Sequence, residues 1–549
     1  MRIQKVLVLA VTAMVAVVFA GAQTPIEITV SSNLVRSNFR GVGFHAELFL
    51  DRITSEYFDQ VIAKRWRELN PAFARVLHHW GPGKAAVRDE KALQVLAREL
   101  LFMKEATDTE IYLTTGAMKA TAPGDERKAY ASAVADELSY LLGKGATNIK
   151  YYGSTNELSL HEWADLRNDL PTYRDYHRLI FEELKQRNIP VKLLATDASP
   201  VMFWNTLQWA ADNMDDVTGV YGAHHYANNL LPGDLDFYGW FKTQCSWAVE
   251  LAKAKNKDFI LGEFGPGQYL ELRWGIRWDT PEFYGTPQEP QAGLQVGEAT
   301  LAAINAGAYA MAYWTFADFP DDPRSRSINQ WGLFKSLANG GAVRAPYYCY
   351  GLLSKYLRGP ASVHEVTTAN DKLRVAAVER EADGSWSLAV INRDSQDAPL
   401  SIKFPKTPGK PFRKFVYDPA NVPVTEDGDL QSPVGKVAML DGSLSDTVKA
   451  NSMAVYTTAY DDDPPAPVQG LEVKEVGATS SVKGMPGDAK RLTWRPNKEI
   501  DLCYYRIYHG GVRIASTVST EFVDAGPTRS RPGEYTVVAV DTSGNASPR

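Results

Sequence analysis

Eight short, apolar, β-rich runs alternate with longer stretches of helical pattern between residues 38 and 358. The predicted strands are Phe39–Glu47, Phe73–Trp80, Glu110–Met118, Asn148–Glu157, Val191–Ala198, Val217–Tyr226, Phe259–Gly267 and Ala308–Asp318. The predicted helices between them include Asp89–Thr107, Asp125–Gly143, Tyr173–Arg187, Gly239–Lys255 and Ala292–Ala306. Eight such units fit an α/β fold with a (β/α)8 TIM barrel over residues 38–358. A doubly wound open sheet is the alternative, and it is disfavoured because no glycine-rich phosphate-binding loop follows the first strand.

Polar side chains gather at the carboxyl ends of these strands, where barrels of this kind place their functional sites. They are His45, Glu47, Arg75, His78, His79, Trp80, Thr114, Thr115, Asn156, Glu157, Asp197, His224, His225, Tyr226, Glu263, Trp314 and Asp318. Two of these residues are acids that close an apolar run: Glu157 ends N-I-K-Y-Y-G-S-T-N-E, and Glu263 ends F-I-L-G-E. A buried carboxylate is costly unless it has a task. Glu157 and Glu263 are therefore the candidate reactive groups.

Two carboxyl groups about 5 Å apart across a barrel mouth suit retaining glycoside hydrolysis. One group gives a proton to the leaving oxygen, while the other attacks the anomeric carbon. The first group then acts as a base on water.

The arrangement of Asn156-Glu157 on the fourth strand and Glu263 on the seventh resembles the large clan of (β/α)8 retaining glycoside hydrolases. That clan includes cellulases, β-mannanases, β-xylosidases and α-L-iduronidases. The resemblance implies that Glu157 is the acid/base, that Glu263 is the nucleophile and that Asn156 binds the sugar 2-hydroxyl. It also implies substrate-binding roles for residues on the second, sixth and eighth strands, namely Arg75, His224, Tyr226 and Trp314.

The resemblance covers the barrel and stops short of one family. The fourth strand reads S-T-N-E-L-S, so the proline that follows the Asn-Glu pair in several members of the clan is missing after Glu157. Other interpretations stand beside the catalytic one. Arg75 can be a structural ion-pair residue, and His224 and His225 can be a core histidine and a helix-facing one. Glu47, Asp197 and Asp318 fit supporting or loop-capping roles better than catalytic ones.

A barrel metallohydrolase is a different class of enzyme that the histidines at strand ends allow. Adjacent histidines on a strand point to opposite faces, so each of the pairs His78-His79 and His224-His225 offers at most one ligand. No H-x-H spacing puts two histidines on one face. We therefore predict no metal and no other cofactor.

Aromatic side chains are frequent in the predicted loops after the strands, and the chain has 13 Trp and 26 Tyr. Flat aromatic faces suit the C–H faces of sugar rings. Trp80, Trp274, Trp278 and Trp314 are the candidate sugar-stacking residues, and His79 beside Trp80 is a further candidate for substrate binding.

The first 22 residues have the pattern of a secretory signal peptide. Arg2 and Lys5 precede an apolar run from Val6 to Ala20, and Ala20-Gly21-Ala22 is a small-residue cleavage site. The alternative, a membrane anchor, is disfavoured because the run is short for a span. We expect a secreted or periplasmic bacterial protein with no membrane attachment after cleavage. The formal net charge of −6 argues against a nucleic-acid partner.

The pattern after residue 358 changes to short alternating strands separated by turns. Residues 359–460 predict an antiparallel β-sandwich, and residues 23–37 are expected to add a strand to it. Residues 461–467, D-D-D-P-P-A-P, are a stiff polar linker. Residues 468–549 resemble a fibronectin type III domain, with Trp494 and Tyr535 in the usual core places and V-D-T-S-G-N-A-S near the end. Cys245, Cys349 and Cys503 have no metal-type spacing and are expected to be buried packing residues.

The sequence therefore predicts an exported, metal-independent retaining glycoside hydrolase that cleaves β-glycosidic bonds in plant or microbial polysaccharides or oligosaccharides. Its partner is then a carbohydrate substrate. A non-catalytic carbohydrate-binding or adhesion protein that keeps the barrel as a scaffold is the alternative from another class.

Overall fold

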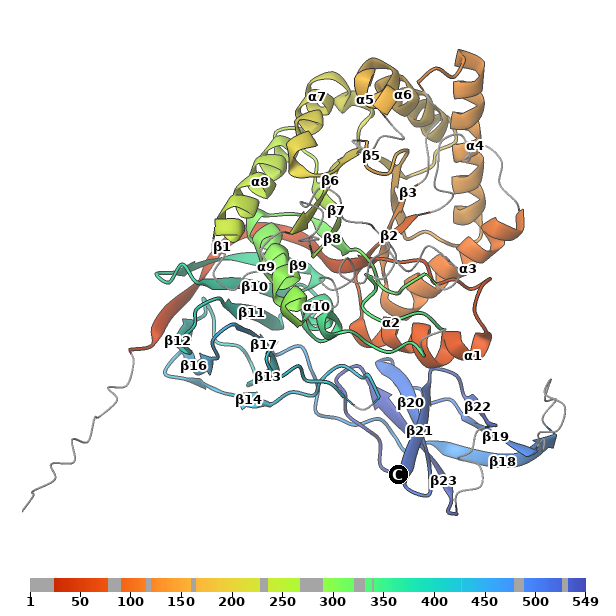
Figure 1. Cartoon of the computed structure of the whole chain (residues 1–549), viewed down its shortest axis with the longest axis vertical. Coiled ribbons are helices and arrows are strands. Elements are labelled where there is room, and N and C mark those ends of the chain that lie inside the picture. Colours follow the sequence, from red (N-terminus) through yellow and green to blue (C-terminus); the bar gives the residue numbers. More distant parts are fainter. Residues whose placement is uncertain are drawn as a thin grey trace, which may run out of the picture.

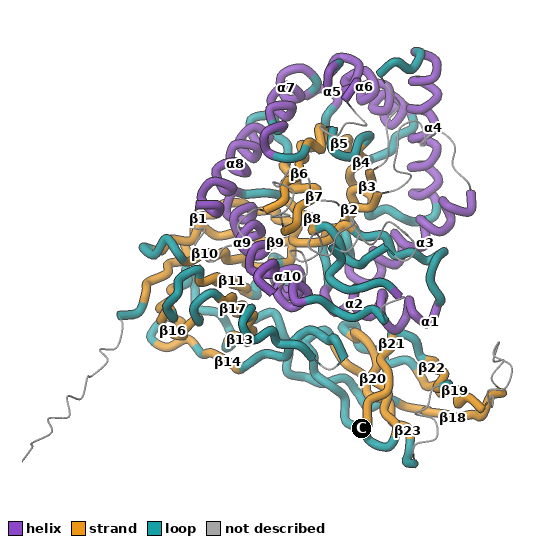
Figure 2. The backbone as a smooth tube through the Cα atoms, in the orientation of Figure 1, coloured by secondary structure: helices purple, strands orange, loops and turns teal. Residues whose placement is uncertain are grey.

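The structure is a computed structural model that describes residues 24–77, 90–114, 120–158, 164–227, 236–266, 290–319, 331–337, 340–425, 427–477, 488–525 and 532–549. Figures 1 and 2 show a barrel surrounded by helices, a layer of antiparallel strands beneath it and a smaller group of strands at the C-terminal end. The predicted signal peptide lies outside the described residues.

Eight parallel strands form a closed barrel, which confirms the predicted central fold. Each strand pairs with the next, and β8 pairs back with β1 from Gly41↔Ala310 to Phe44↔Tyr313. The strands are β1 Ile26–His45, β2 Phe73–Leu77, β3 Glu110–Thr114, β4 Ile149–Gly153, β5 Lys192–Ala198, β6 Val220–Ala227, β7 Phe259–Pro266 and β8 Ala310–Tyr313.

Helices cover the outside of the barrel (Figure 1). They are α1 Ser55–Tyr57, α2 Ala63–Leu69, α3 Glu90–Thr107, α4 Gly124–Gly143, α5 Ala164–Asn168, α6 Leu170–Gln186, α7 Asn205–Asn213, α8 Asp236–Lys253, α9 Pro290–Ala306 and α10 Ala345–Tyr356, with short helical turns η1 Phe58–Ile62, η3 Val201–Phe203 and η4 Asp215–Val217.

Local sequence explains where α6 begins. The side chain of Asp169 accepts a hydrogen bond from the backbone N–H of Thr172, and Pro171 occupies the first turn, where no backbone donor is needed.

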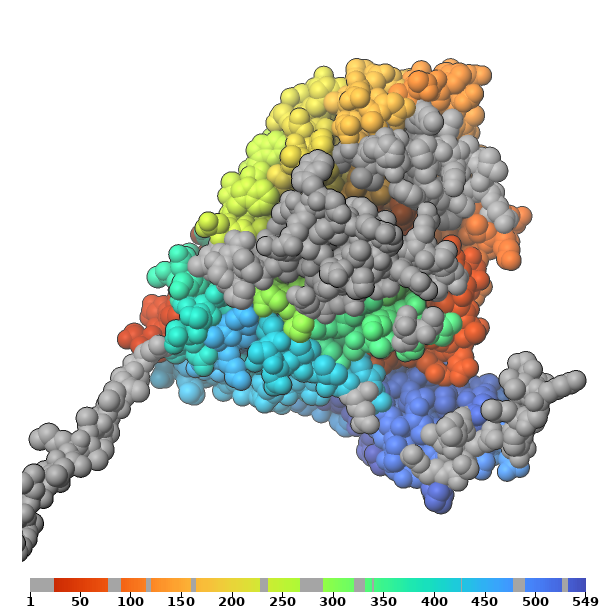
Figure 3. Space-filling view, viewed as in Figure 1, coloured from red at the N-terminus to blue at the C-terminus, as the bar shows by residue number. Residues whose placement is uncertain are grey.

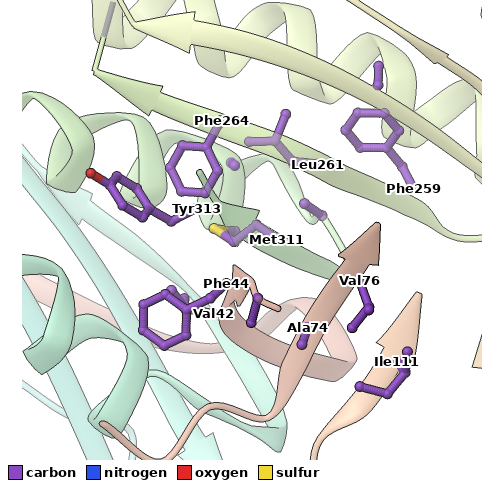
Figure 4. Packing of buried hydrophobic residues seen from close by; sticks show 14 of the residues in the cluster. Val42, Phe44, Ala74, Val76, Ile111, Phe259, Leu261, Phe264, Met311 and Tyr313 are labelled. Carbon is purple, nitrogen blue, oxygen red and sulfur yellow. The ribbon is translucent and has the colours of Figure 1, made fainter. Parts of the chain in front are cut away.

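Side chains of the barrel strands alternate between the helix-facing core and the interior. On β2, Ala74 and Val76 belong to the core under the helices, whereas Phe73 belongs to the interior cluster with Tyr112 and Ile260. Figure 4 shows outward-facing side chains of β1, β2, β3, β7 and β8 packed together. Because alternate residues share a face, Arg75 must follow Phe73 into the barrel.

A second group of strands packs under the barrel. It consists of β9 Arg358–Thr368, β10 Leu373–Arg380, β11 Trp386–Asn392, β12 Ala398–Lys403, β13 Phe412–Tyr417, β14 Gly435–Val437, β15 Met439–Leu440, β16 Ser443–Val448 and β17 Ser452–Thr457. Its strands pair with one another in antiparallel fashion and share their own core, which includes Trp386, Leu400 and Tyr456. In the space-filling view the segment from about residue 370 to 457 lies below the helices of the barrel (Figure 3).

Strand β1 belongs to both groups of strands. Residues Ile26–Thr29 pair in parallel with Leu400–Lys403, and Gly41–Phe44 pair with β8 in the barrel. Between these two ends β1 pairs with β9 through several register shifts. The expected boundary between residues 37 and 38 thus falls inside one continuous strand.

The strands between residues 469 and 541 form two three-stranded sheets that pack against the barrel side of the molecule. The strands are β18 Gln469–Gly477, β19 Asp488–Arg495, β20 Leu502–His509, β21 Val512–Thr517, β22 Glu521–Asp524 and β23 Tyr535–Asp541. Buried Asp429, in the loop before β14, accepts hydrogen bonds from Lys64 of α2 and from Arg513 of β21. Trp494 is buried in the core between the sheets, and Tyr535 packs against this core. The fibronectin type III assignment stays a prediction.

The three cysteines are buried and unpaired, as expected. Within the described residues, no helix combines the length and the apolar composition needed to span a membrane.

The close approach of β1 to β2 predicts a strong effect of one small substitution. A Cβ added at Gly43 would lie 1.7 Å from the carbonyl oxygen of Phe73, whose backbone cannot rotate away. Gly43→Ala is therefore expected to lower the thermal unfolding midpoint by several degrees or to prevent folding, because strand separation must increase.

Gly143→Ala is the matched control, since a Cβ there meets no atom within 4 Å at the end of α4. Its midpoint should stay within about 2 °C of the unmodified protein. Equal midpoints for the two variants, measured by calorimetry, would contradict the packing argument.

Candidate active site

Arg75 is the centre of a group of polar side chains in the barrel mouth. Its guanidinium is fully buried, and its Nη1 donates to Oε2 of Glu263 at 2.8 Å. Its Nη2 donates to Oδ1 of Asn156 at 2.5 Å and to Oδ2 of Asp197 at 3.1 Å. One cation on β2 therefore holds polar groups from the ends of β4, β5 and β7.

His224, at the carboxyl end of β6, faces acids with both of its ring nitrogens. Nε2 lies 2.6 Å from Oδ1 of Asp197, and Nδ1 lies 3.1 Å from Oε1 of Glu157 and 3.9 Å from Oε2 of Glu263. Burial by itself lowers the pKa of His224, but the Asp197 and Glu263 carboxylates outweigh it and raise the pKa to about 9. The ring is therefore a cation at neutral pH, so Nδ1–H donates to Glu157 and Nε2 forms an ion pair with Asp197.

Asp197 carries negative charge between the two cations. Burial favours its neutral form, but His224 and Arg75 outweigh burial and hold the pKa of Asp197 below its ordinary value. Asp197 fixes the orientation of both cations without facing solvent, since its side chain is 1% exposed.

Glu157 and Glu263 face each other across this group. Their nearest carboxylate oxygens and a ring nitrogen of His224 all lie within 4.8 Å of one another. The side chains are 13% and 7% exposed, so both reach the mouth while most of their surface is covered. The backbone of Glu157 has a φ of +53°, an unfavourable conformation for a residue other than glycine. The surrounding contacts hold Glu157 in this strained backbone.

Two donors and one further cation surround the carboxylate of Glu263. Arg75 donates to Oε2, the hydroxyl of Tyr226 donates to Oε1 at 2.5 Å, and Nδ1 of the cationic His224 lies 3.9 Å from Oε2. Burial raises the pKa of Glu263, while His224 and Arg75 lower it, Glu157 raises it further and Tyr226 lowers it. The net effect is a raised pKa of Glu263, and the nearby Glu157 carboxylate contributes to it because two carboxylates this close repel each other.

Gly262 permits this close packing. A Cβ at this position would lie 3.1 Å from both Oδ1 of Asp197 and Nε2 of His224. The glycine of F-I-L-G-E thus gives room for the ion pair that lies beside Glu263.

His45 and Trp314 continue the site from β1 and β8. Their rings lie 4.3 Å apart, and Nδ1 of His45 lies 3.4 Å from Nη1 of Arg75. Because arginine can only donate, Nδ1 of His45 accepts and its Nε2 carries the proton. Burial, reinforced by the neighbouring cations, lowers the pKa of His45 well below its ordinary value, so the ring is neutral. Trp314 is half-buried beside this ring.

The structure brings together seven of the predicted site residues: Glu157, Glu263, Asn156, Arg75, His224, Tyr226 and Trp314. The other four predicted residues, His79, Trp80, Trp274 and Trp278, lie outside the described residues. Arg75 does form ion pairs, and its partners are Asp197 and the predicted nucleophile Glu263.

His225 and Asp318 serve other parts of the structure. His225 points away from the mouth and packs against Phe241 of α8 at 5.2 Å, and burial lowers its pKa to about 4. Both oxygens of Asp318 accept hydrogen bonds from Arg344, at 2.9 and 2.7 Å, and this pair holds the loop after β8.

Sequence reasoning gave Asp197 a supporting role without identifying its partners Arg75 and His224, and it did not connect Glu47 with Glu99. The signal for Asp197 was present, since it is the acid at the end of β5, between the strands of Glu157 and His224. Burial raises the pKa of Glu47 to about 8, with Glu99 adding to the rise. Burial also raises the pKa of Glu99 to about 7. Nothing in the sequence indicates that a helix residue 52 positions later meets Glu47.

One cation position is conceivable at this site, because Glu157, His224 and Glu263 offer ligand atoms within 4.8 Å of one another. The positive charges of Arg75 and His224 disfavour a bound metal ion at this position. Arg75 already pairs with Glu263, and His224 is protonated at neutral pH and so offers no lone pair on either nitrogen.

Comparison with solved structures gives the same fold. A glycoside hydrolase family 30 subfamily 8 xylanase from Clostridium acetobutylicum aligns with a TM-score of 0.55 and 13% identity over 78% of this chain and 99% of its own. A bacterial orthologue of human α-L-iduronidase aligns with a TM-score of 0.57 and 14% identity over 95% of this chain and 98% of its own. A family 51 α-L-arabinofuranosidase from Bifidobacterium longum aligns with a TM-score of 0.55 and 14% identity over 79% and 99%. At these identities the similarity defines the class of fold, a (β/α)8 barrel with an attached β-sheet layer.

Comparison of sequences identifies no family and only one short region of similarity, as follows. No family model matches the chain. A curated α-amylase from Niallia circulans is 32% identical over 114 residues, which is 21% of this chain. The chain spans 9% of the length of that curated relative.

The ion pairs of Arg75 predict that removing its side chain lowers the free energy of unfolding strongly. Arg75→Met leaves Asp197 and Glu263 buried with fewer donors, so we expect a loss of about 3–5 kcal/mol of unfolding free energy. Denaturant unfolding at neutral pH measures this loss.

Arg178→Met is the matched control, because Arg178 also contacts two acids but is 37% exposed. Its cost should stay below about 1 kcal/mol. A loss for Arg75→Met as small as that for Arg178→Met would refute the central role of Arg75.

The raised pKa of Glu47 predicts that the stability of the folded protein depends on pH. Its pKa is about 8 in the folded protein, against an ordinary value near 4.5, so folding favours the protonated form. This stabilising contribution is complete below about pH 4.5 and is lost progressively as pH rises towards 8, by at most about 1.4 kcal/mol per pH unit. Glu47→Gln should flatten this decline in unfolding midpoint between pH 5 and 8.

The control is Glu56→Gln, at an exposed glutamate of α1, which should leave the pH slope unchanged. Some slope should persist in Glu47→Gln because Glu99 also has a raised pKa. Parallel pH curves for the unmodified protein and Glu47→Gln would count against a buried, neutral Glu47.

Proposed function

We propose that this protein is a retaining glycoside hydrolase that cleaves β-glycosidic bonds of polysaccharides or oligosaccharides, with Glu157 as acid/base and Glu263 as nucleophile. The observation that carries the proposal is the approach of the two carboxylates within 4.8 Å at the mouth of a (β/α)8 barrel. Retaining enzymes need the two carboxyl groups about 5–5.5 Å apart, whereas inverting enzymes need about 6.5–9.5 Å to admit a water.

The surroundings of Glu263 support its role as nucleophile. Arg75 and Tyr226 donate to its two oxygens, and both contacts stabilise a carboxylate. Attack on the anomeric carbon forms a covalent glycosyl-enzyme while Glu157 passes a proton to the leaving oxygen.

The second step uses the same two residues. Glu157, now without its proton, takes a proton from water, and the resulting nucleophile releases the sugar from Glu263. The cationic His224 lies 3.1 Å from Glu157 and holds it towards Glu263 in both steps.

Asn156 and Trp314 are proposed to hold the sugar. Arg75 donates to Oδ1 of Asn156, so Nδ2 of Asn156 points away from Arg75 and serves as the donor for the sugar 2-hydroxyl. The half-buried indole of Trp314 offers a flat face for the sugar ring. His79, Trp80, Trp274 and Trp278 remain proposed substrate contacts.

Export supports a substrate outside the cell. The proposed signal peptide over residues 1–22 would deliver the protein to the periplasm or the medium, and one solved structure with the same fold is a conserved exported protein from Bacteroides fragilis. Several neighbours in the structural comparison act on plant or microbial polysaccharides by their names, such as xylanases and an endo-β1,6-glucanase.

Kinetics with aryl glycosides test the proposal. Glu157→Ala should lower kcat by about 10²–10⁴-fold on substrates with poor leaving groups, because general acid catalysis is lost. Glu263→Ala should lower it at least as much on every substrate. Azide should rescue Glu157→Ala with a β-configured glycosyl azide, since azide then intercepts the glycosyl-enzyme from the open face.

Glu110→Gln is the matched control, since Glu110 is a buried glutamate at the amino end of β3. It should keep its kcat. Equal hydrolysis by the unmodified protein and both alanine variants would show that the two acids are not the catalytic pair. Stoichiometric metal in the active protein would instead favour a metallohydrolase, and carbohydrate binding without hydrolysis of any substrate would favour an adhesion protein.

A further inference from the structure

A cavity of about 600 Å³ lies outside the barrel mouth, between helix α8 and the β9–β10 hairpin. Its helix side includes Asp236, Tyr238 and Lys242. Its strand side includes Glu365 and Asp371. Figure 1 shows α8 ending above these strands, where the barrel and the antiparallel layer meet. The cavity thus forms at a junction between two parts of the fold, a common place for ligand sites.

The floor of the cavity is built and rigid. Arg374 lies over the ring of Tyr238 at 4.7 Å, and its Nε donates to Glu298 at 2.8 Å. Asn305 donates its side-chain amide to the hydroxyl of Tyr238 at 2.8 Å and to the carbonyl of Val375 at 2.7 Å. Tyr238 is therefore fixed.

The rim offers polar groups of both charges. Lys242 and Asp236 supply one charge of each sign on the helix side. Glu365 and Asp371 add two acids on the opposite rim, with hydroxyl and amide groups of Thr367 and Asn370 between them.

These groups limit the class of ligand. An anion is disfavoured, because acids outnumber the one accessible cation on the rim. A bound cation is disfavoured too, since within the described residues the acids of this cavity are not among the groups whose ligand atoms converge within 4.8 Å. The lining combines these polar groups with apolar side chains such as Val35, Leu373 and Val375, so it offers both hydrogen bonds and apolar contacts. A neutral polyhydroxylated ligand satisfies mixed donors and acceptors of this kind.

Gly239 leaves part of the cavity wall open. It lines the cavity, and a Cβ there would meet no atom within 4 Å, so this part of α8 has open space above its backbone. The next residue, Trp240, is 44% exposed and is anchored against His225 and Phe237. Its exposed indole offers a flat face for a further sugar ring of the same polysaccharide.

We propose that this cavity and Trp240 form a second carbohydrate-binding site, which holds a neutral polysaccharide outside the barrel mouth. The choice of a saccharide among polyhydroxylated ligands rests on the proposed function. Two separate sites on one chain would keep the polymer near the mouth by raising its local concentration.

Affinity electrophoresis of the full-length protein tests this site, in gels containing soluble xylan, mixed-linkage β-glucan, β-1,6-glucan or galactomannan. At least one polymer should retard the unmodified protein. Lys242→Ala, Gly239→Gln and Trp240→Ala should each weaken that retardation about tenfold or more, while kcat on an aryl glycoside stays unchanged.

Lys253→Ala is the matched control, because it removes the same charge from the far end of α8, where Lys253 pairs with Glu250. Its retardation should stay normal. Gly239→Ala is the control for Gly239→Gln, since a methyl group at this position leaves the cavity wall open. Gly239→Gln is built in open space, so it tests access without disturbing the fold.

Two results would overturn the second site. One is retardation that all three variants retain in full; the other is the absence of retardation by every polymer. Either can occur while Glu157 and Glu263 still prove to be catalytic, so failure of this site is distinguishable from failure of the proposed function. Conversely, retardation that depends on Lys242 without hydrolysis of any glycoside would support the site and refute the catalytic proposal.

Discussion

The pairing of buried Arg75 with Asp197 and Glu263 is the interaction on which the site depends. A guanidinium inside a barrel is tolerated only when acids and other acceptors surround it. Here these groups come from the ends of β4, β5 and β7, so the charge balance can be satisfied only if the strands close in the right order. The same requirement fixes the two acids at the mouth and places His224 between them.

The network also explains why the mouth tolerates so many ionisable groups. Arg75 and His224 supply two positive charges, and Asp197, Glu157 and Glu263 supply three acids, of which the last two repel each other. The two positive charges offset part of this repulsion. The unfavourable backbone at Glu157 persists because the surrounding contacts hold it.

The lower part of the molecule stabilises the barrel through shared elements. Strand β1 is common to the barrel and the antiparallel layer, and buried Glu298 of α9 pairs with Arg374 and Arg393 of the layer. Asp429 connects the layer to α2 and to the C-terminal sheets through Lys64 and Arg513. These contacts also create the junction at which the proposed second carbohydrate site lies, so one arrangement supports both stability and binding.

The sequence by itself determined the barrel, the strand on which each acid lies and the face of β2 on which Arg75 lies, because period-2 alternation and strand order are local properties. It also separated His224 from His225, since neighbours on a strand point to opposite sides. Only the tertiary structure decided that Asp197 joins Arg75 to His224 and that the Glu99 carboxyl of α3 contributes to the raised pKa of Glu47. It also decided that Glu157 and Glu263 come within 4.8 Å of each other. Such contacts depend on strand stagger and on side-chain direction across the barrel, and no local pattern along the chain encodes either.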